Sequence, residues 1–411
     1  MKRLAPWTLL LVTLLVVIVP LALAAATTAA TPAKANRSPA APIASALSTV
    51  TGIAISPLLG TGAYGLYQWV AAKDDAARAA LPWYAQWTFW APALLLVGLC
   101  AAKDGLGAMV PPGWKKPLDV LETVENKFSG LIAAGAVVPF AVSTMTKMMF
   151  ESGAVAAADG PVLAQSGVAA IHLAAVDLTW LLNLLTVPFG LAVFGVVWLA
   201  SHAINVLILL SPWGAIDAGL KTARTALLGL VTVAATLDPW IGAVLSLVVV
   251  VIAYFVAGWA FRLTVFGTVF SWDFITRRRH RFSPPENDNL MFAGANCPGV
   301  PLRTYGRLVQ RTQGGLEFVY RPWLVLAPRM APIVAEPKTL AVGEGLFFSD
   351  IVTDNGRTLF SLPPRYRGHE GVVARAYLMG GGVQPAGLRK AWSALREMLG
   401  GRALKNEPHA A

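Results

Sequence analysis

The chain has 411 residues, of which 56% are hydrophobic and only 13% are charged. Soluble domains carry about 25% charged residues, so this composition excludes an ordinary soluble protein and indicates that much of the chain lies in lipid. The net charge is +11. From Asp273 onward there are 19 Lys and Arg against 11 Asp and Glu, a net of +8. Such a surface attracts anionic lipid or nucleic acid. We expect anionic lipid headgroups as candidate partners and no nucleic-acid partner.

The N-terminus has the pattern of a secretory signal peptide over residues 1–24. Lys2 and Arg3 precede an apolar stretch, and Ala22-Leu23-Ala24 is a small-residue cleavage site. The alternative is an uncleaved signal anchor, and we favour cleavage. Residues 25–43 are rich in Ala, Thr and Pro, which predicts a low-complexity linker.

Residues 44–272 are predicted to form a multi-pass transmembrane domain. A membrane span needs about 20 mostly apolar residues. The stretch 166–210 is too long for one span, and the turn-like Val187-Pro188-Phe189-Gly190 is expected to divide it. The predicted fold is therefore an α-helical polytopic membrane protein with about seven spans: 44–71, 86–102, 129–146, 166–186, 190–210, 222–238 and 240–262.

The basic run Arg277-Arg278-Arg279-His280-Arg281 directly follows the last predicted span. Basic residues flanking a span favour the cytoplasmic side, so we expect a bacterial inner-membrane protein with a cytoplasmic C-terminus. A cleaved signal and an odd number of spans agree with that orientation. Arg277, Arg278, Arg279 and Arg281 are also candidate contacts for anionic lipid headgroups, or they act as a topology signal alone.

Part of the apolar domain resembles an internal duplication. Trp114, Leu121, Thr123, Gly130 and Leu131 recur 99 residues later as Trp213, Leu220, Thr222, Gly229 and Leu230. Three predicted spans separate equivalent positions, so the copies should have opposite directions. That arrangement is typical of transporters.

Polar residues within the apolar stretches form a candidate intramembrane polar site. Ionisable groups in lipid usually face the bundle interior or a polar pathway. His172, Asp177 and Asn183 lie in one predicted span, and His202 and Asn205 share a helix face in the next. The alternatives are a surface position for His172 and simple interhelical hydrogen bonding.

The segment 103–127 places Asp119, Glu122 and Asn126 on one helix face. Its two interpretations are a divalent-cation site and, more strongly favoured, a solvated amphipathic loop helix. No nucleotide-binding, hydrolase or metalloprotease motif is present in the sequence. We therefore expect no catalytic residue, no metal and no cofactor. The two cysteines, Cys100 and Cys297, predict no disulfide framework.

Residues 273–299 are predicted to be a basic juxtamembrane linker, and residues 300–411 a small α+β cytoplasmic domain. Its β-like runs are 304–311, 315–320, 322–328, 345–352 and 357–362, followed by an amphipathic helix over Arg389–Leu399. The order of a small sheet closed by a helix weakly resembles a pleckstrin-homology-like module. Two Arg and aromatic clusters, at Tyr320-Arg321-Pro322-Trp323 and Leu362–Glu370, are candidate ligand or partner surfaces, although Pro363-Pro364 is better explained as a turn.

Residues 44 to about 262 resemble an uncharacterised family of bacterial multi-pass membrane proteins known as a domain of unknown function. The resemblance rests on Ser56-Pro57-Leu58-Leu59-Gly60, on the segment from Lys103-Asp104 to Leu118-Asp119, and on the paired Gly-Leu openings. It implies a membrane location and no particular activity.

Two functions follow as hypotheses. The first is a small-solute transporter or channel, favoured by the duplication and the intramembrane polar residues. The second is a non-catalytic membrane scaffold or regulator, whose cytoplasmic domain binds a protein partner or anionic lipid. A polar cavity within the spans would favour the first, and tightly packed spans with a groove on the C-terminal domain would favour the second.

Overall fold

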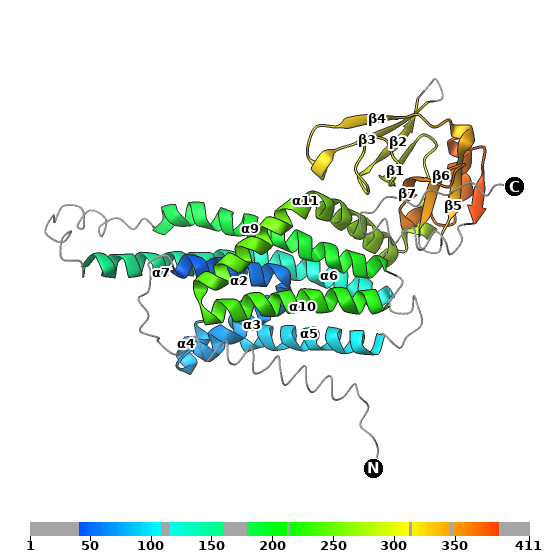
Figure 1. Ribbon diagram of the computed structural model, residues 1–411. Coiled ribbons are helices and arrows are strands. Elements are labelled where there is room, and N and C mark those ends of the chain that lie inside the picture. The colour runs from blue at the N-terminus through cyan, green and yellow to red at the C-terminus, as the bar shows by residue number, and fades with distance from the viewer. Residues whose placement is uncertain are drawn as a thin grey trace, which may run out of the picture. The chain divides into compact units, whose positions relative to one another are not determined.

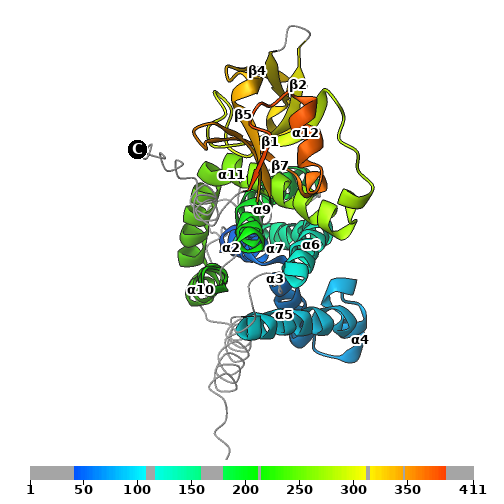
Figure 2. The ribbon, with the colours of Figure 1, turned by 90° about the vertical axis from the view of Figure 1, so that its right-hand side faces the viewer.

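The structure is a computed structural model, and it describes residues 41–107, 116–158, 179–211, 214–311, 315–345 and 348–385. The predicted signal peptide, His172, Asp177 and the predicted helix Arg389–Leu399 lie outside these residues. The chain forms two compact units. A helical unit comprises Met1–Ile208 and Pro212–Ala257, and a second unit, which holds the sheet, comprises Leu209–Ser211 and Gly258–Ala411. Figures 1 and 2 show their elements.

The helical unit begins with two short helices where one span over 44–71 was predicted. Helix α2 is Ala41–Ile55 and α3 is Pro57–Ala71, each of 15 residues. At 1.5 Å per residue each is about 22 Å long, short of the ~30 Å hydrocarbon core. The chain is extended at Ser56, as expected before a proline. A Cβ at Gly60 would lie 2.6 Å from the Ile53 Cα, so only glycine permits this bend.

Short elements connect α3 to the next apolar helix. Helix α4 is Asp75–Ala79, capped by Asp74, whose carboxylate accepts a 2.7 Å hydrogen bond from the Ala77 N–H. The 3₁₀ turn η1 is Trp83–Ala85, and α5 is Trp87–Gly107. Among the residues whose side chains are described, the apolar part of α5 is Trp87–Cys100, which is shorter than a full span.

The next helices are longer than predicted. Helix α6 (Lys116–Ile132) continues through a π-helical turn, η2 (Ala133–Val137), into α7 (Val138–Ala158). Helix α9 is Thr179–Leu210, and it passes through Pro188 without ending. The predicted break at Val187–Gly190 is therefore wrong. Instead, Gly190 packs closely on α7, because a Cβ there would lie 2.7 Å from the Val142 Cγ2.

Two further helices complete the apolar part. Helix α10 is Gly214–Leu237 and α11 is Pro239–Ile275. The Asp238 carboxylate between them accepts hydrogen bonds from the N–H groups of Trp240 (2.7 Å) and Ile241 (3.2 Å), which caps the start of α11. The predicted span 240–262 thus belongs to a helix that continues for 13 more residues.

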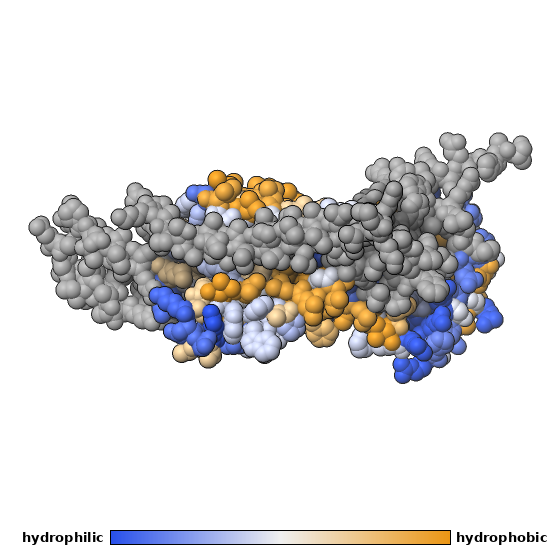
Figure 3. Space-filling model, turned by 90° about the horizontal axis from the view of Figure 1, so that it is seen from below, coloured by the Kyte–Doolittle hydropathy of each residue, from blue (hydrophilic) through white to orange (hydrophobic). Residues whose placement is uncertain are grey.

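Four stretches in the described residues are long and apolar enough to cross a membrane: Asp119–Met148, Asn183–Leu210, Ile216–Leu237 and Pro239–Ile275. The described residues do not support about seven spans, because one predicted span is two short helices and another boundary lies inside a continuous helix. The four stretches suggest association with a membrane. Exposed apolar side chains such as Leu99, Leu237 and Phe255 agree with this, and Figure 3 shows apolar surface on one face.

The directions of the helices contradict an inverted repeat. Asn126 of α6 contacts His202 late in α9, whereas Ser143 of α7 contacts Asn183 early in α9, so α9 is antiparallel to α6–α7. Helix α10 follows after a short connection and folds back along α9 (Figure 1). The two copies of the repeat, in α6–α7 and α10, consequently have the same direction.

The second unit contains an eight-stranded sheet in the order β4-β3-β2-β1-β7-β6-β5-β8, with parallel pairing only between β5 and β8. The strands are β1 Asp288–Ala293, β2 Tyr305–Gln310, β3 Leu316–Tyr320, β4 Arg329–Ile333, β5 Leu340–Glu344, β6 Ser349–Thr353, β7 Thr358–Leu362 and β8 Val383–Pro385. The short helix α12 is Glu370–Ala376, and the 3₁₀ turns are η3 Arg278–His280, η4 Pro322–Leu324, η5 Pro337–Thr339 and η6 Pro364–Tyr366.

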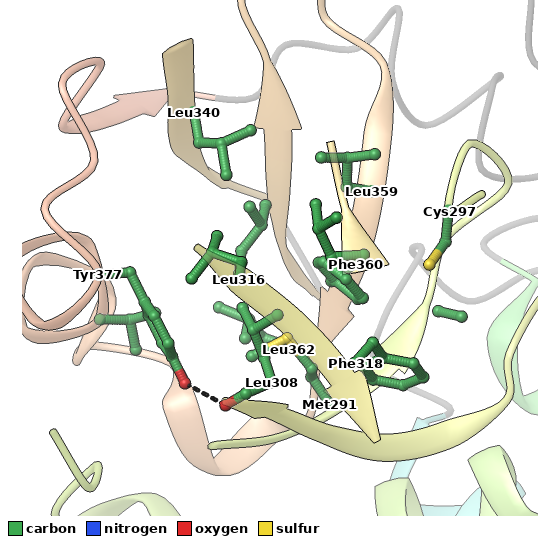
Figure 4. Packing of buried hydrophobic residues seen from close by; sticks show 14 of the residues in the cluster. Met291, Cys297, Leu308, Leu316, Phe318, Leu340, Leu359, Phe360, Leu362 and Tyr377 are labelled. Carbon is green, nitrogen blue, oxygen red and sulfur yellow. Dashed lines mark hydrogen bonds between the residues drawn. The ribbon is translucent and has the colours of Figure 1, made fainter. Parts of the chain in front are cut away.

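The sheet curls around one apolar core. The rings of Phe318 in β3 and Phe360 in β7 lie 5.1 Å apart although two strands separate β3 from β7 in the sheet. The buried Tyr377, after α12, donates a 2.7 Å hydrogen bond to the Leu308 carbonyl, as Figure 4 shows. The last part of α11 packs on this unit, since Phe266 lies 4.6 Å from Phe292.

Several predicted strands are confirmed, and others are not. The runs 304–311, 315–320 and 357–362 contain β2, β3 and β7. The run 322–328 begins as the turn η4, where Trp323 and Leu324 have positive φ angles. Strand β1 lies in the region 273–299 that was predicted to be a linker. Pro363-Pro364 is a turn after β7, as expected.

Candidate functional sites

The helical unit contains a polar cluster formed by Glu122, Asn126, His202, Asn205, Lys221 and Arg224. Three contacts between helices hold it together. Lys221 Nζ lies 2.8 Å from Glu122 Oε2, and His202 Nδ1 lies 2.8 Å from Asn126 Oδ1. Arg224 donates to the Asn205 side-chain carbonyl. The cluster therefore joins α6, α9 and α10.

His202 is the most enclosed member of the polar cluster, with no exposed surface. Because the Asn126 Oδ1 can only accept, His202 Nδ1 carries the proton of their hydrogen bond. The indole of Trp198 stacks on the imidazole, with ring centroids 5.1 Å apart and an interplanar angle of 16°. A Cβ at Gly130 would lie 2.5 Å from the Trp198 Nε1. The glycine of the first repeat copy thus admits the indole that covers His202.

The polar cluster lies toward one end of the continuous helix α6–α7 and of α9. Asn126 is 7 residues after Asp119, and Arg224 is 8 residues after Ile216, where their apolar stretches begin. At 1.5 Å per residue, these positions lie roughly 10–12 Å inside the stretches. His202 is equally far from the end of α9. The contacts therefore fasten α6 and α9 near one end, whereas Arg224 lies close to the middle of the stretch Ile216–Leu237.

The structure brings together two of the five residues of the predicted intramembrane site. His202 and Asn205 share a face of α9, as predicted, and both belong to the polar cluster. Asn183 is 19 residues earlier in α9, where its Nδ2 donates a 3.1 Å hydrogen bond to Ser143 Oγ. At 1.5 Å per residue this separation is about 28 Å. His172 and Asp177 lie outside the described residues.

The sequence interpretation missed the contribution of α6. Asp119 and Asn126 are only 3% and 5% exposed, so the favoured solvated helix over 103–127 is wrong for this face. Among the described residues no group of His, Cys, Asp or Glu forms a metal-binding cluster. One signal was present: Glu122 and Lys221 are 99 residues apart, the period of the repeat. Opposite charges at equivalent positions of two parallel helices could have indicated their pairing.

The basic run after α11 is mostly exposed. Arg277, Arg279 and Arg281 are exposed, and Arg281 donates a 2.8 Å hydrogen bond to the Thr276 carbonyl. Arg278 Nη1 lies 4.0 Å from the Asp273 carboxylate. Asp273 is also bound by the buried Arg365, whose Nε donates at 2.8 Å. The candidate lipid contacts thus begin directly beside a buried ion pair.

The second unit contains a pocket of about 200 Å³ that the sequence indicated only in part. We call it the arginine pocket. It is lined by Gly258, Phe261, Arg262 and Val265 of α11 and by residues of the strands and loops, including Arg303, Tyr305, Tyr320, Arg321, Trp323 and Arg329. Part of this lining is the Arg and aromatic cluster predicted at 320–323. Among the described residues that line the pocket, none is acidic.

The four arginines of the arginine pocket differ in how they are held. Arg262 Nε donates a 3.0 Å hydrogen bond to the Leu302 carbonyl. Arg303 is 8% exposed, and its guanidinium lies 5.5 Å from the centre of the Phe266 ring. Arg321 and Arg329 are exposed at the mouth. Two of the lining arginines, Arg262 and Arg303, are thus held by neighbouring groups, and the other two are exposed.

An exposed apolar loop borders the arginine pocket. Its residues Trp323, Leu324, Val325 and Leu326 are 44%, 45%, 78% and 50% exposed. Trp323 and Leu324 have φ angles of 54° and 60°, which large side chains rarely adopt. The Trp323 ring lies 4.7 Å from the Phe261 ring of α11. This backbone directs apolar side chains outward beside a basic pocket.

The fold and sites define a membrane-associated helical protein with a sheet-containing second unit. In comparisons with known proteins, no family model, no curated protein and no solved structure matches the chain. The resemblances to a family of unknown function and to a pleckstrin-homology-like module therefore stay predictions.

Proposed function

We propose that the protein is a non-catalytic scaffold or regulator of a bacterial inner membrane, in which the helical unit is the anchor and the sheet unit is the recognition module. The observation that carries this proposal is the arginine pocket. Four arginines, Arg262, Arg303, Arg321 and Arg329, line one concavity, and none of its described lining residues is acidic. Such an arrangement suits an anionic ligand, because guanidinium groups bind phosphate and carboxylate oxygens with charge-assisted hydrogen bonds.

The packing of the polar cluster supports an anchoring role for the helical unit. Its charges face each other across helices, and the Glu122–Lys221 pair is only 12–14% exposed. Polar contacts of this kind hold membrane helices together. The same direction of the two repeat copies also removes the inverted repeat, which was the main support for a transporter.

A small-solute transporter or channel is the second candidate, and one observation favours it. A pocket of about 140 Å³ in the helical unit is lined by Thr61, Glu125 and Ser129 beside apolar residues such as Phe89 and Phe128. Proton or potassium flux through proteoliposomes, compared with empty liposomes, distinguishes the candidates. The scaffold proposal expects equal flux, and flux abolished by Glu125→Gln would favour the transporter.

The orientation in the membrane is part of the proposal. Arg277, Arg279 and Arg281 favour a cytoplasmic position for the second unit. A reporter fused after Ala411 should therefore report a cytoplasmic location. A periplasmic signal would contradict the orientation, and the sheet unit would then face ligands outside the cell.

The recognition role is tested by binding of a soluble anion. The full chain in neutral detergent is titrated with inorganic pyrophosphate at constant ionic strength, and its thermal unfolding is followed. A ligand that binds only the folded state raises the melting temperature. We expect a rise for the wild type and none for the double variant Arg321→Gln/Arg329→Gln. Arg375→Gln, which changes an exposed arginine of α12, is the matched control. An equal rise in all three proteins would refute the proposed site.

A further inference from the structure

We infer that the arginine pocket binds the phosphate of an anionic phospholipid, while the loop Trp323–Leu326 enters the outer acyl layer. This inference rests on the proposed function, since it specifies the ligand of the recognition module. It differs from the sequence prediction, which assigned anionic lipid to Arg277, Arg278, Arg279 and Arg281.

The length of α11 gives the depth of the pocket. The helix begins at Pro239, after the capping residue Asp238, and no charged residue occurs before Arg262. Twenty residues at 1.5 Å per residue, from Pro239 to Gly258, cover the ~30 Å of a hydrocarbon core. Gly258 and Arg262 both line the pocket. If α11 crosses the bilayer from Pro239, the arginine pocket therefore lies at the level of the headgroups.

The charge and size of the pocket suit a headgroup. Arg262 and Arg303 are held in the wall, and Arg321 and Arg329 are exposed at the mouth. A volume of about 200 Å³ is below the roughly 300–1,000 Å³ of pockets that enclose a whole drug-sized ligand. A compact phosphate group can thus be enclosed while the acyl chains remain outside.

The apolar loop distinguishes a lipid from a soluble anion. Trp323 packs on Phe261 of α11, and the side chains of Val325 and Leu326 point outward with 78% and 50% exposure. Tryptophan is favoured at the membrane interface, and exposed aliphatic side chains gain from burial in acyl chains. A soluble phosphate compound would need no such border. The occurrence of both features at one site favours a phospholipid.

The basic run after α11 is a separate site along the same helix. Arg277 is 15 residues beyond Arg262, which is about 22 Å at 1.5 Å per residue. This distance is more than twice the Debye length of about 8 Å at physiological ionic strength. Variants of the two sites should consequently have independent effects on lipid binding.

The inference is tested with the full chain in neutral detergent. Binding of phosphatidylglycerol and of phosphatidylcholine is measured by native mass spectrometry, and pyrophosphate binding by the shift in melting temperature. Four variants are compared with the wild type: Arg321→Gln/Arg329→Gln in the pocket, Val325→Ser/Leu326→Ser in the loop, Arg277→Gln/Arg279→Gln/Arg281→Gln in the basic run, and the control Arg375→Gln. All the replaced side chains are exposed, and an unchanged melting temperature without ligand verifies folding.

We expect the wild type to prefer phosphatidylglycerol and the pocket variant to bind it at least tenfold more weakly. The loop variant should lose affinity for the lipid and keep its pyrophosphate response, whereas the basic-run and control variants should bind like the wild type. Equal lipid affinity of wild type and pocket variant would overturn the inference. So would a loop variant with unchanged lipid affinity, which would identify a site for soluble anions and leave the proposed recognition role intact. If pyrophosphate does not raise the melting temperature of the wild type, the proposed function is refuted instead.

Discussion

The ion pair between Asp273 and Arg365 offers a quantitative test of how the end of α11 is fixed to the sheet unit. The Asp273 side chain is fully buried and that of Arg365 is 6% exposed. The carboxylate accepts from the Arg365 Nε at 2.8 Å and from the Arg365 backbone N–H at 3.3 Å. Asp273→Ala would leave the Arg365 charge buried without this partner. Removing one partner of a buried pair costs about 3–5 kcal/mol.

The reverse substitution should cost less. In Arg365→Met, the buried Asp273 carboxylate still has Arg278, whose Nη1 is 4.0 Å away and whose side chain is 43% exposed, so a small movement can compensate the charge. The double variant Asp273→Leu/Arg365→Met should be less destabilised than Asp273→Ala, because no buried charge remains.

Hydrogen exchange of the full chain, followed by mass spectrometry, measures the free energy of opening of β1 and β7. The matched control is Asp288→Ala, which removes an exposed ion pair with Arg307 (58% and 43% exposed) and should cost about 0–1 kcal/mol. If Asp273→Ala increases exchange no more than Asp288→Ala does, the buried pair does not hold the sheet unit to α11.

The remaining predictions concern the repeat glycines, the buried cysteine and the ion pair of the polar cluster. Gly130→Ala should destabilise the helical unit by about 1–3 kcal/mol through overpacking against Trp198. Its control is Gly229→Ala, whose added Cβ has no atom within 4 Å and which should be neutral or stabilising by up to ~1 kcal/mol. Equal melting temperatures of the two variants would contradict this prediction. Burial raises the pKa of the Cys297 thiol from 9.0 to about 12, so its stability contribution should be complete below pH 9 and be lost as the pH rises toward 12. In a Cys100→Ser background, maleimide labelling at pH 8 should be slow until the chain is unfolded, and rapid labelling of the folded variant would refute burial of Cys297. In the polar cluster, Glu122→Gln should lower the melting temperature more than Glu122→Gln/Lys221→Gln, because the single change leaves a buried charge. If the loss in the double variant equals the sum of the losses in the two single variants, the two side chains are not coupled.

The sequence was most informative where the hydrophobic pattern is local. Strands β2, β3 and β7 and the apolar helices were recognisable from periodicity and composition. The prolines led to two wrong expectations, a helix break at Pro188 and a continuous span across Pro57. At Pro188 close packing of Gly190 on Val142 maintains the helix, while at Pro57 a bend permitted by Gly60 ends α2. In both cases the outcome depends on a neighbouring helix, which a local pattern does not contain.

The candidate sites were less predictable for the same reason. His202 and Asn205 were identified from their helical spacing, but their partners Asn126 and Arg224 lie in other helices. The arginine pocket combines residues from α11, from strands β2, β3 and β4 and from the loops before β2 and β4, and its arginines are up to 67 residues apart, between Arg262 and Arg329. No spacing in the sequence relates these arginines, because only tertiary folding brings them to one pocket.

The central claim is that the sheet unit meets the membrane at the arginine pocket. It is tested most directly by the depth of a spin label at Val325→Cys, in a full-length Cys100→Ser/Cys297→Ser background reconstituted in phosphatidylglycerol nanodiscs. The account predicts that this label collides often with oxygen and rarely with a water-soluble nickel chelate, while a label at Arg375→Cys shows the opposite. Equal accessibility of both labels to the nickel chelate would contradict the account.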